Sequence, residues 1–336
     1  MILVTGGTGL VGAHLLFALC QKESKIRATY RSEGKIRRVE QLFSYYTDTP
    51  TLFLERIEWV QADVNDIPAL EKAFVSITKV YHIAALVSFD PKDDKKLLKT
   101  NVEGTANIVN LCLGHMVKKL CFASSIAALG PSVGQKPITE QNEGVDGSTT
   151  YAISKYHAEM EVWRASQEGL AVAIVNPGII VAPGFWKSSS GSFFYQAYKA
   201  PRYYLPHGTG FVGINDVVNA MTHLMEADVK NERYILVNQN WTYRQFAELL
   251  AKGLKKPIPK KEIKPWMLEA LWRMDWLRAN LFGKRRLLTK MLAQQLKFRD
   301  NYDNTKIKES LGFEFEDLQG STQKYCAIFL SEQALS

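Results

Sequence analysis

The sequence lacks the features that define several whole classes of protein. No apolar run approaches the roughly 20 residues that a membrane-spanning helix requires. Met1 is followed at once by the strand-like run 2–4, which leaves no room for a signal peptide, so we expect a cytoplasmic protein. There is no internal repeat, and 46% hydrophobic residues with 23% charged residues exclude wholesale disorder. A chain of this length and composition is expected to fold around a sizeable core.

Cysteine is scarce. The chain of 336 residues contains four, without a C-x-x-C pair or a histidine at metal-ligand spacing: Cys20, Cys112, Cys121 and Cys326. The disulfide scaffold of a secreted domain is therefore excluded, and we expect reduced thiols in a protein without a metal site.

Acidic residues are scarce in one segment. Residues 252–308 carry 16 Lys and Arg against 5 Asp and Glu, a net charge of +11, whereas the whole chain has a formal net charge of only +8. No nucleic-acid-binding motif accompanies this charge, so we expect no nucleic-acid partner. Within 264–298, tryptophans alternate with arginines and lysines. Such a basic amphipathic region favours either weak contact with a membrane surface or a helical cap over a substrate site with a solvated basic rim.

Short β-branched runs alternate with amphipathic stretches along the first half of the chain. Strands are predicted at 2–5, 26–30, 57–61, 79–84, 119–124 and 171–176, and helices near 11–22, 34–45, 66–76, 95–114 and 151–168. This alternation predicts an α/β fold with a doubly wound parallel sheet, the Rossmann fold. We expect residues 1–176 to form the nucleotide-binding domain. A smaller, mostly helical substrate lobe is expected over 177–336, with 214–240 returning to the first domain.

A glycine-rich turn joins the first strand to the first helix. Gly6 permits a tight turn, Gly9 lets the backbone approach a pyrophosphate, and Gly12 allows close packing of the helix. The start of a helix also supplies free N–H groups and the positive end of its dipole. We therefore expect a dinucleotide to lie against this turn, whose candidate binding residues are Gly6, Thr8, Gly9, Leu10, Val11 and Gly12.

The residues after the second strand indicate which dinucleotide binds. An acidic residue there would bind the ribose 2′-OH of NAD, whereas an arginine accommodates the 2′-phosphate of NADP. Arg31 occupies this place and Lys35 follows, while Glu33 is a rival at a less suitable distance. We favour NADP(H) over NAD(H). Asp63, at the end of the third strand, would either accept a hydrogen bond from the adenine or cap the next helix.

Tyr151 and Lys155 lie four residues apart on one face of a predicted helix. A lysine at that distance stabilises tyrosinate and lowers a phenol pKa whose reference value is about 10, which suits the tyrosine to proton transfer. Hydroxyls at the end of the fifth strand, Ser124 and Ser125, precede this pair. The same spacing also occurs at Tyr195 with Lys199 and at Tyr302 with Lys306. We interpret these two matches as coincidences.

These motifs occur together in one order. They are T-G-G-T-G-L-V-G at 5–12, D-V at 63–64, H-I-A-A at 82–85, N-V-E-G-T at 101–105, S-S at 124–125, Y-A-I-S-K at 151–155 and N-P-G at 176–178. In this set the chain resembles the extended short-chain dehydrogenase/reductase family, in its NAD-dependent epimerase/dehydratase grouping. The run F-V-G-I-N-D-V-V-N-A at 211–220 extends the likeness.

The resemblance implies a role for each matching residue. Tyr151 would be the general acid/base, Lys155 would tune it and bind the nicotinamide ribose, and Ser125 rather than Ser124 would hydrogen-bond the substrate oxygen. Asn101 would support the site through a water, or else simply cap a helix. His82 is expected to be structural. The resemblance also implies a set of residues that line the cofactor: Val64, Ile83, Ala84, Pro177 and Ile180. For the two isoleucines, ordinary packing in the core is the alternative.

The departures from the family pattern concern the substrate. Nucleotide-sugar epimerases and dehydratases in this family usually carry an Arg-Asp pair in the segment corresponding to 210–214, where this chain has G-F-V-G-I. An arginine that would bind a diphosphate is thus absent there. The run N-P-G-I-I-V-A-P-G at 176–184 is more similar to the dihydroflavonol-4-reductase-like branch with its 3β-hydroxysteroid-dehydrogenase-like relatives.

Three functions follow from this resemblance. The favoured one is an NADP(H)-dependent reductase of carbonyls on apolar molecules, and the alternative is an NAD-dependent nucleotide-sugar epimerase or dehydratase. A non-catalytic nucleotide-binding protein would not need Asn101, Ser125, Tyr151 and Lys155 together. Eight aromatic residues within 185–204 would either wall an apolar pocket or pack the core of the lobe. The family likeness also implies a homodimer through the helices near 95–114 and 151–168.

Overall fold

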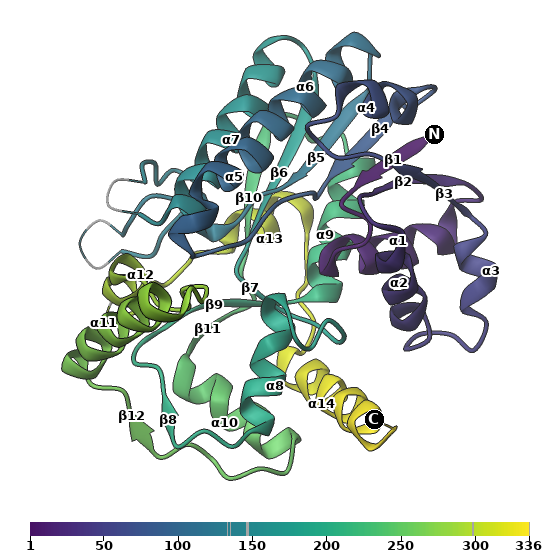
Figure 1. Cartoon of the computed structure of the whole chain (residues 1–336). Coiled ribbons are helices and arrows are strands. Elements are labelled where there is room, and N and C mark those ends of the chain that lie inside the picture. Colours follow the sequence, from purple (N-terminus) through teal and green to yellow (C-terminus); the bar gives the residue numbers. More distant parts are fainter. Residues whose placement is uncertain (133, 135, 146–147, 298, 336) are drawn as a thin grey trace.

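Seven parallel strands form the central sheet of the molecule, in the order β10-β6-β5-β4-β1-β2-β3 (Figure 1). The computed structural model describes residues 1–132, 134, 136–145, 148–297 and 299–335, so that Phe298, which ends the basic segment considered above, lies outside the described residues. The strands of the sheet are β1 (Ile2–Thr5), β2 (Ile26–Tyr30), β3 (Ile57–Gln61), β4 (Lys79–His82), β5 (Lys119–Ala123), β6 (Ala171–Pro177) and β10 (Glu232–Leu236).

The predicted Rossmann-like α/β fold is confirmed, and the first six strands lie where the β-branched runs predict them. The fourth strand ends two residues earlier than predicted. The N–H groups of Ile83 and Ala84 instead donate to the hydroxyl of Thr5, across the end of β1. The seventh strand, β10, was not predicted.

Helices cover both faces of the sheet, with α4, α6 and α7 on one side and α1 and α9 on the other (Figure 1). The helices of this part of the chain are α1 (Leu10–Lys22), α2 (Ile36–Phe43), α3 (Pro50–Leu54), α4 (Ile67–Phe74), α5 (Asp94–Leu98), α6 (Gly104–Gly114), α7 (Thr150–Gln167) and α9 (Ile214–Glu226). The helix predicted near 95–114 is confirmed, and it contains a π-helical turn at Lys99–Glu103, between α5 and α6, that was not predicted.

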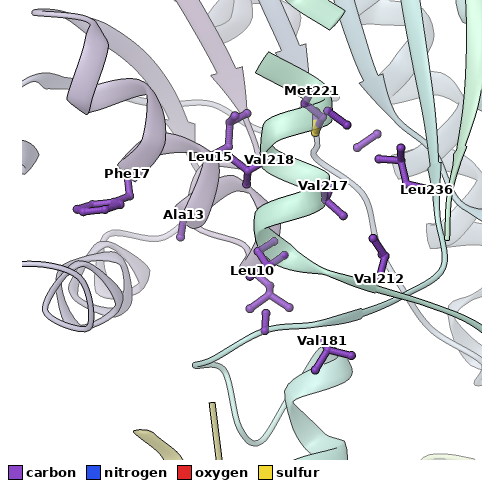
Figure 2. Close-up of a cluster of buried hydrophobic side chains, with 14 of the residues drawn as sticks. Leu10, Ala13, Leu15, Phe17, Val181, Val212, Val217, Val218, Met221 and Leu236 are labelled. Atoms are coloured by element: carbon purple, nitrogen blue, oxygen red, sulfur yellow. The ribbon is translucent and has the colours of Figure 1, made fainter. Parts of the chain in front are cut away.

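Successive strand residues face two separate cores, as expected where side chains alternate across a sheet that is covered on both faces. Val4 packs with α1 and α9, whereas its neighbour Leu3 packs with α4, α6 and α7. Figure 2 shows the first of these cores, where Leu15 of α1 lies beside Val218 and Met221 of α9. This core brings α9 onto the sheet although it follows the sixth strand by more than 30 residues.

The remaining elements form a smaller part next to the carboxyl ends of the strands (Figure 1). A three-stranded sheet consists of β7 (Ile179–Val181), β9 (Gly208–Gly213) and β11 (Gln239–Thr242), and a two-stranded one of β8 (Tyr203–Tyr204) and β12 (Lys261–Glu262). The helices here are α8 (Ser192–Tyr198), α10 (Tyr243–Gly253), α11 (Pro265–Phe282), α12 (Lys290–Gln295) and α14 (Leu318–Leu335), whereas α13 (Thr305–Leu311) packs beside β10 of the central sheet. The division of the chain into two domains at residue 176 stays a prediction.

The aromatic residues after β7 mainly pack the core of this smaller part. Trp186 and Phe194 are buried and meet edge to face, and Trp186 also meets Phe329 of α14. Phe193 packs against Phe246 of α10. For these residues core packing, rather than the wall of a substrate pocket, is the correct alternative.

All four cysteines are free and buried. Among the residues that the structure describes, no helix has the length and apolar character that crossing a membrane requires.

Candidate active site

The glycine-rich turn is closely packed against its surroundings. Gly6 has a positive φ of 73°, and a Cβ there would lie 2.8 Å from the Cα of Ala84. A Cβ on Gly12 would lie 2.2 Å from the carbonyl oxygen of Gly6. Gly9 is the N-cap of α1, and no side chain caps the first turn. The N–H groups at such an uncapped helix start are of the kind that bind phosphate. Thr8, Leu10 and Val11 lie in the same turn.

Cations gather beside this turn at the end of β2. Arg31 lies 3.7 Å from the carboxylate of Asp63, and both side chains are partly exposed. Burial lowers the pKa of Lys35, and the nearby charges of Arg31, Arg38 and Lys96 lower it further. Such mutual repulsion favours the binding of an anion. Lys96, on α5, is a member of this group that the sequence did not indicate.

Asp63 does not cap the helix that follows it. One carboxylate oxygen of Asp63 accepts hydrogen bonds from the backbone and side-chain nitrogens of Asn65, at 3.0 and 3.1 Å. The N-cap of α4 is Asp66, which accepts from the N–H of Ala69. The capping alternative for Asp63 is therefore wrong, and the second oxygen of its carboxylate faces Arg31.

The other residues expected to line a cofactor come from four places in the fold. Ile83 and Ala84 follow β4 and lie next to Gly6. Val64 is buried against α6, whereas Pro177 ends β6 and is also buried. Ile180 belongs to β7 of the three-stranded sheet and is half-buried.

Tyr151 and Ser125 meet at the carboxyl edge of β5 and β6. Thr149 caps α7 by accepting a hydrogen bond from Ala152, which places Tyr151 in the first turn of the helix. Burial raises the pKa of the Tyr151 phenol, and its hydrogen bond with Ser125 offsets part of this rise. Ser124 is buried instead, and its hydroxyl has no hydrogen-bond partner among the described residues. The structure thus brings Ser125, not Ser124, to Tyr151.

Lys155 is buried one turn further along α7. Its ammonium donates a hydrogen bond to the carbonyl oxygen of Ala123 at 2.7 Å and lies 4.4 Å from the centre of the Phe122 ring. Burial lowers the pKa of Lys155 to about 8, although the carboxylate of Glu159 acts in the opposite direction. A lysine in this state changes charge close to neutral pH.

Asn101 lies in the π-helical turn between α5 and α6 and does not cap a helix. Its amide binds both backbone groups of Leu86, accepting from the N–H at 2.7 Å and donating to the carbonyl at 2.9 Å. It also donates to the hydroxyl of Ser154, the neighbour of Lys155. Asn101 therefore ties the segment after β4 to α7. π-Helical turns of this kind are frequent at functional sites.

His82 is structural, as predicted. Its two ring nitrogens hydrogen-bond to the hydroxyls of Thr5 and Thr105, at 2.7 and 3.0 Å. Burial lowers its pKa to about 3, so the ring is neutral at physiological pH. In the other two Y-x-x-x-K matches, the lysines make structural contacts. Lys199 lies over the ring of Tyr195, and Lys306 pairs with Glu232.

A buried ionic network below the catalytic residues was not predicted. Glu159, one turn after Lys155, is fully buried and pairs with Arg233 of β10 at 3.1 Å. Asn176 joins Glu159 to the backbone oxygen of Ser125, with distances of 2.6 and 3.0 Å. The one signal in the sequence is the helical spacing from Lys155 to Glu159, which places both on one face of α7.

The segment that follows β4 covers Tyr151 and is held by the connection between α11 and α12. Phe89 packs edge to face on Tyr151, with ring centres 5.8 Å apart. The buried carboxylate of Asp90 accepts from the N–H of Arg286 and pairs with Arg285, which also pairs with Asp93. The end of α11 is therefore fastened to the cover of the candidate catalytic residues.

Comparisons with known proteins agree with this arrangement. The model of the NAD dependent epimerase/dehydratase family matches residues 2–237. Sterol demethylase protein B of Methylococcus capsulatus is 28% identical over 295 residues, which are 84% of this chain and 84% of that protein. Dihydroflavonol 4-reductase of Hordeum vulgare is 26% identical over 277 residues, 77% of each chain. The crystal structure of gox2253 superposes with a TM-score of 0.80 at 25% identity, covering 99% of this chain and 98% of that one.

Proposed function

The chain belongs to the NAD dependent epimerase/dehydratase family and is an NAD(P)-dependent enzyme of the extended short-chain dehydrogenase/reductase type, and we propose that it reduces a carbonyl to an alcohol on an apolar small molecule with NADP(H). The observation that carries this proposal is that the phenol of Tyr151 lies at the hydroxyl of Ser125, one helical turn before the buried Lys155. A proton donor, a second hydroxyl and a cation lie together there, which is the set that carbonyl reduction uses.

The glycine-rich turn fits a dinucleotide, because a side chain on Gly6 or Gly12 would collide with the neighbouring backbone. The uncapped start of α1 would hold the pyrophosphate. We assign the 2′-phosphate of NADP to the cations around Lys35, with Arg31 as its main partner. An arginine suits a phosphate because its donors form a planar fork.

When bound, the nicotinamide supplies the hydride that the carbonyl carbon receives. Ser125 would donate a hydrogen bond to the carbonyl oxygen, and Tyr151 would donate the proton that completes the alcohol. Because burial raises the pKa of Tyr151, the phenol is protonated at neutral pH, as a proton donor must be. Lys155 would stabilise the tyrosinate after transfer and bind the nicotinamide ribose.

The apolar substrate is supported by three observations. The segment 210–214 lacks the arginine that would bind a sugar diphosphate. The cover over Tyr151 exposes Val87 and Phe89, with 56% and 38% of each residue accessible. The names of the two relatives refer to a sterol and to a dihydroflavonol, which are both built on fused rings.

The first test identifies the nucleotide that the purified protein carries. The protein is denatured and any released nucleotide is identified by mass spectrometry. We expect little nucleotide or partial occupancy by NADP(H), since a cosubstrate exchanges in every turnover. Near-stoichiometric NAD would contradict the proposal and favour an epimerase or dehydratase that retains its cofactor.

The second test replaces the proton donor. Tyr151→Phe should reduce NADPH-dependent turnover of apolar ketones by about a hundredfold or more, because the proton donor is lost while the ring is kept. Affinity for NADPH should stay nearly unchanged. Tyr156→Phe, on the same helix, is the matched control and should keep its activity. Wild-type turnover in the Tyr151→Phe variant would refute this mechanism.

A further inference from the structure

An apolar stripe runs along α11 and is exposed to solvent. Trp266, Met274, Leu277 and Leu281 expose 70%, 66%, 50% and 67% of their surface. Their spacing of 8, 11 and 15 residues from Trp266 places all four on one side of a helix with 3.6 residues per turn. Leu268, by contrast, is only 1% exposed and packs toward the protein.

Two further apolar residues near the end of α11 are exposed. Phe282, the last residue of the helix, and Leu287 are 71% and 74% exposed. Figure 1 shows α11 at the outer edge of the molecule, with α12 on one side of it. Contiguous exposed apolar surfaces of this kind are rare on proteins that meet only water, and they mark sites of interaction.

Positive charge surrounds this stripe. Several arginines here are neutralised within the protein, since Arg273 pairs with Glu269 and Arg278 pairs with Asp275. Across the described part of the chain, the lysines that flank the stripe and form no ion pair are Lys260, Lys261, Lys264, Lys284 and Lys290. The segment 252–308 keeps its net charge of +11. A partner for this surface must therefore be both apolar and negatively charged.

We propose that α11 docks this protein on the surface of an anionic lipid bilayer. The helix lies in the plane of the interface, with the stripe from Trp266 to Leu281 among the acyl chains and the flanking lysines at the headgroups. Trp266, at the start of the stripe, suits the boundary between headgroups and acyl chains. Each lysine near such a surface adds to the attraction, and the attraction weakens with salt.

The docked orientation has a consequence for the active site. The connection after α11 is fastened to the segment that covers Tyr151, through Arg285 with Asp90 and Asp93. A bilayer under α11 would therefore lie beside the cover of the candidate catalytic residues. An apolar substrate could then enter from the membrane; this consequence rests on the proposed function, whereas the docking does not.

The experiment measures co-flotation of the purified protein with vesicles, without cofactor or substrate. Vesicles of phosphatidylcholine with phosphatidylglycerol are compared with vesicles of phosphatidylcholine alone. We expect binding to the anionic vesicles that decreases in high salt, and a decrease of about tenfold or more in Leu277→Glu/Leu281→Glu. Because the assay needs no turnover, its result is independent of whether the reductase proposal holds.

The matched control is Leu52→Glu/Val75→Glu. Leu52 lies on α3 and Val75 directly follows α4, and they are 56% and 55% exposed. Figure 1 shows both helices away from α11, so the variant makes the same change in charge, with a similar loss of apolar surface, elsewhere. It should bind vesicles more strongly than Leu277→Glu/Leu281→Glu by about tenfold. Circular dichroism of both variants checks that they fold.

Three outcomes would overturn the proposal. The first is a wild-type protein that does not float with anionic vesicles at low salt. The second is a wild-type protein that binds no vesicle and is a dimer in sedimentation velocity, whereas Leu277→Glu/Leu281→Glu is a monomer. The stripe would then be an interface between two copies of the chain. Equal flotation of the two double variants would likewise show that the stripe does not dock.

Discussion

Lys155 is held by groups that act on its charge in opposite directions. Burial disfavours its ammonium, while the carboxylate of Glu159 favours it, and the pKa of Lys155 is lowered to about 8. Loss of that proton removes the positive charge proposed to bind the ribose. The kcat/KM for NADPH, which reports the cofactor-free enzyme, should therefore fall as the pH rises through about 8.

Glu159→Gln should move this fall to lower pH. Glutamine keeps the shape of the side chain and can still bond to Asn176, but it removes the charge that raises the pKa of Lys155. The measurement is the pH profile of kcat/KM for NADPH. Glu161→Gln, two residues along the same helix and partly exposed, is the control and should leave the profile in place. An unshifted profile in Glu159→Gln would show that Glu159 has no effect on the charge of Lys155.

Arg31 offers a second test at this scale. Arg31→Glu replaces the proposed phosphate ligand by a carboxylate beside Asp63, and NADPH affinity should decrease by roughly tenfold to a hundredfold while NADH binding is kept or improved. The ratio of the two dissociation constants is the measurement. Arg37→Glu makes the same charge reversal on α2 at an exposed position and should change the ratio far less. An unaltered ratio in Arg31→Glu would exclude Arg31 as the phosphate ligand.

These residues differ in how far the sequence could indicate them. Arg31 directly follows a strand, so its place at the sheet edge could be predicted from local pattern alone. The role of Glu159 depends on Arg233, which lies 74 residues later on a strand that was not predicted. A helical spacing places Glu159 near Lys155, but only the packed sheet brings Arg233 to it.

At the scale of elements, the contact between α1 and the glycine-rich turn is the most sensitive point. A Cβ at Gly12 would lie 2.2 Å from the backbone oxygen of Gly6, so Gly12→Ala must displace the helix or the turn. We expect a loss of about 1 to 3 kcal/mol in the free energy of unfolding and a marked loss of cofactor affinity. Urea unfolding and cofactor titration measure the two effects.

Gly114→Ala is the control for this substitution. Gly114 ends α6, and a Cβ there would meet nothing within 4 Å. Alanine should be neutral or slightly stabilising, by less than about 1 kcal/mol. If Gly12→Ala were equally neutral, the close packing would not be what requires glycine at this position.

The elements themselves were predictable where one local pattern decides them. The first six strands are short runs of mainly apolar residues, and all but β3 are buried along most of their length, a pattern that the sequence displays directly. The π-helical turn at Lys99–Glu103 was not, because it depends on the contacts of Asn101 with Leu86 and Ser154. Helix α14 was also missed, since its buried residues meet α10 and α8, neither of which is near it in sequence.

At the scale of the whole molecule, the C-terminal helix joins the two parts of the structure. Glu332 of α14 accepts hydrogen bonds from Gln41 and Tyr45, which lie on and just after α2, and from Trp186 in the segment after β7. Beside it, a cavity of about 570 Å³ is lined by residues of the same three segments. The carboxylate thus links the three segments where they meet.

Glu332→Ala should therefore destabilise the molecule beyond its own helix. It leaves the half-buried Tyr45 and the buried Trp186 without their acceptor, and hydrogen bonds to a charged group contribute about 1.5 to 3 kcal/mol each when buried. Since this site is partly open to water, we expect a total loss of about 2 kcal/mol in the free energy of unfolding. Urea unfolding measures the loss, and Lys324→Ala, exposed on the same helix, should change it by less than about 0.5 kcal/mol.

The same substitution should also weaken NADPH binding by a few-fold while leaving kcat unchanged. Helix α2 carries Arg38, one of the cations that act on Lys35. Glu332 of α14 holds the end of α2 through the hydrogen bond that it accepts from Gln41. A looser α2 would present its cations less favourably, whereas Tyr151 and Lys155 belong to α7 and would keep their places. A lowered kcat with unchanged NADPH affinity would contradict this coupling, because it would place the effect of Glu332 on the catalytic residues instead of on the cofactor cations.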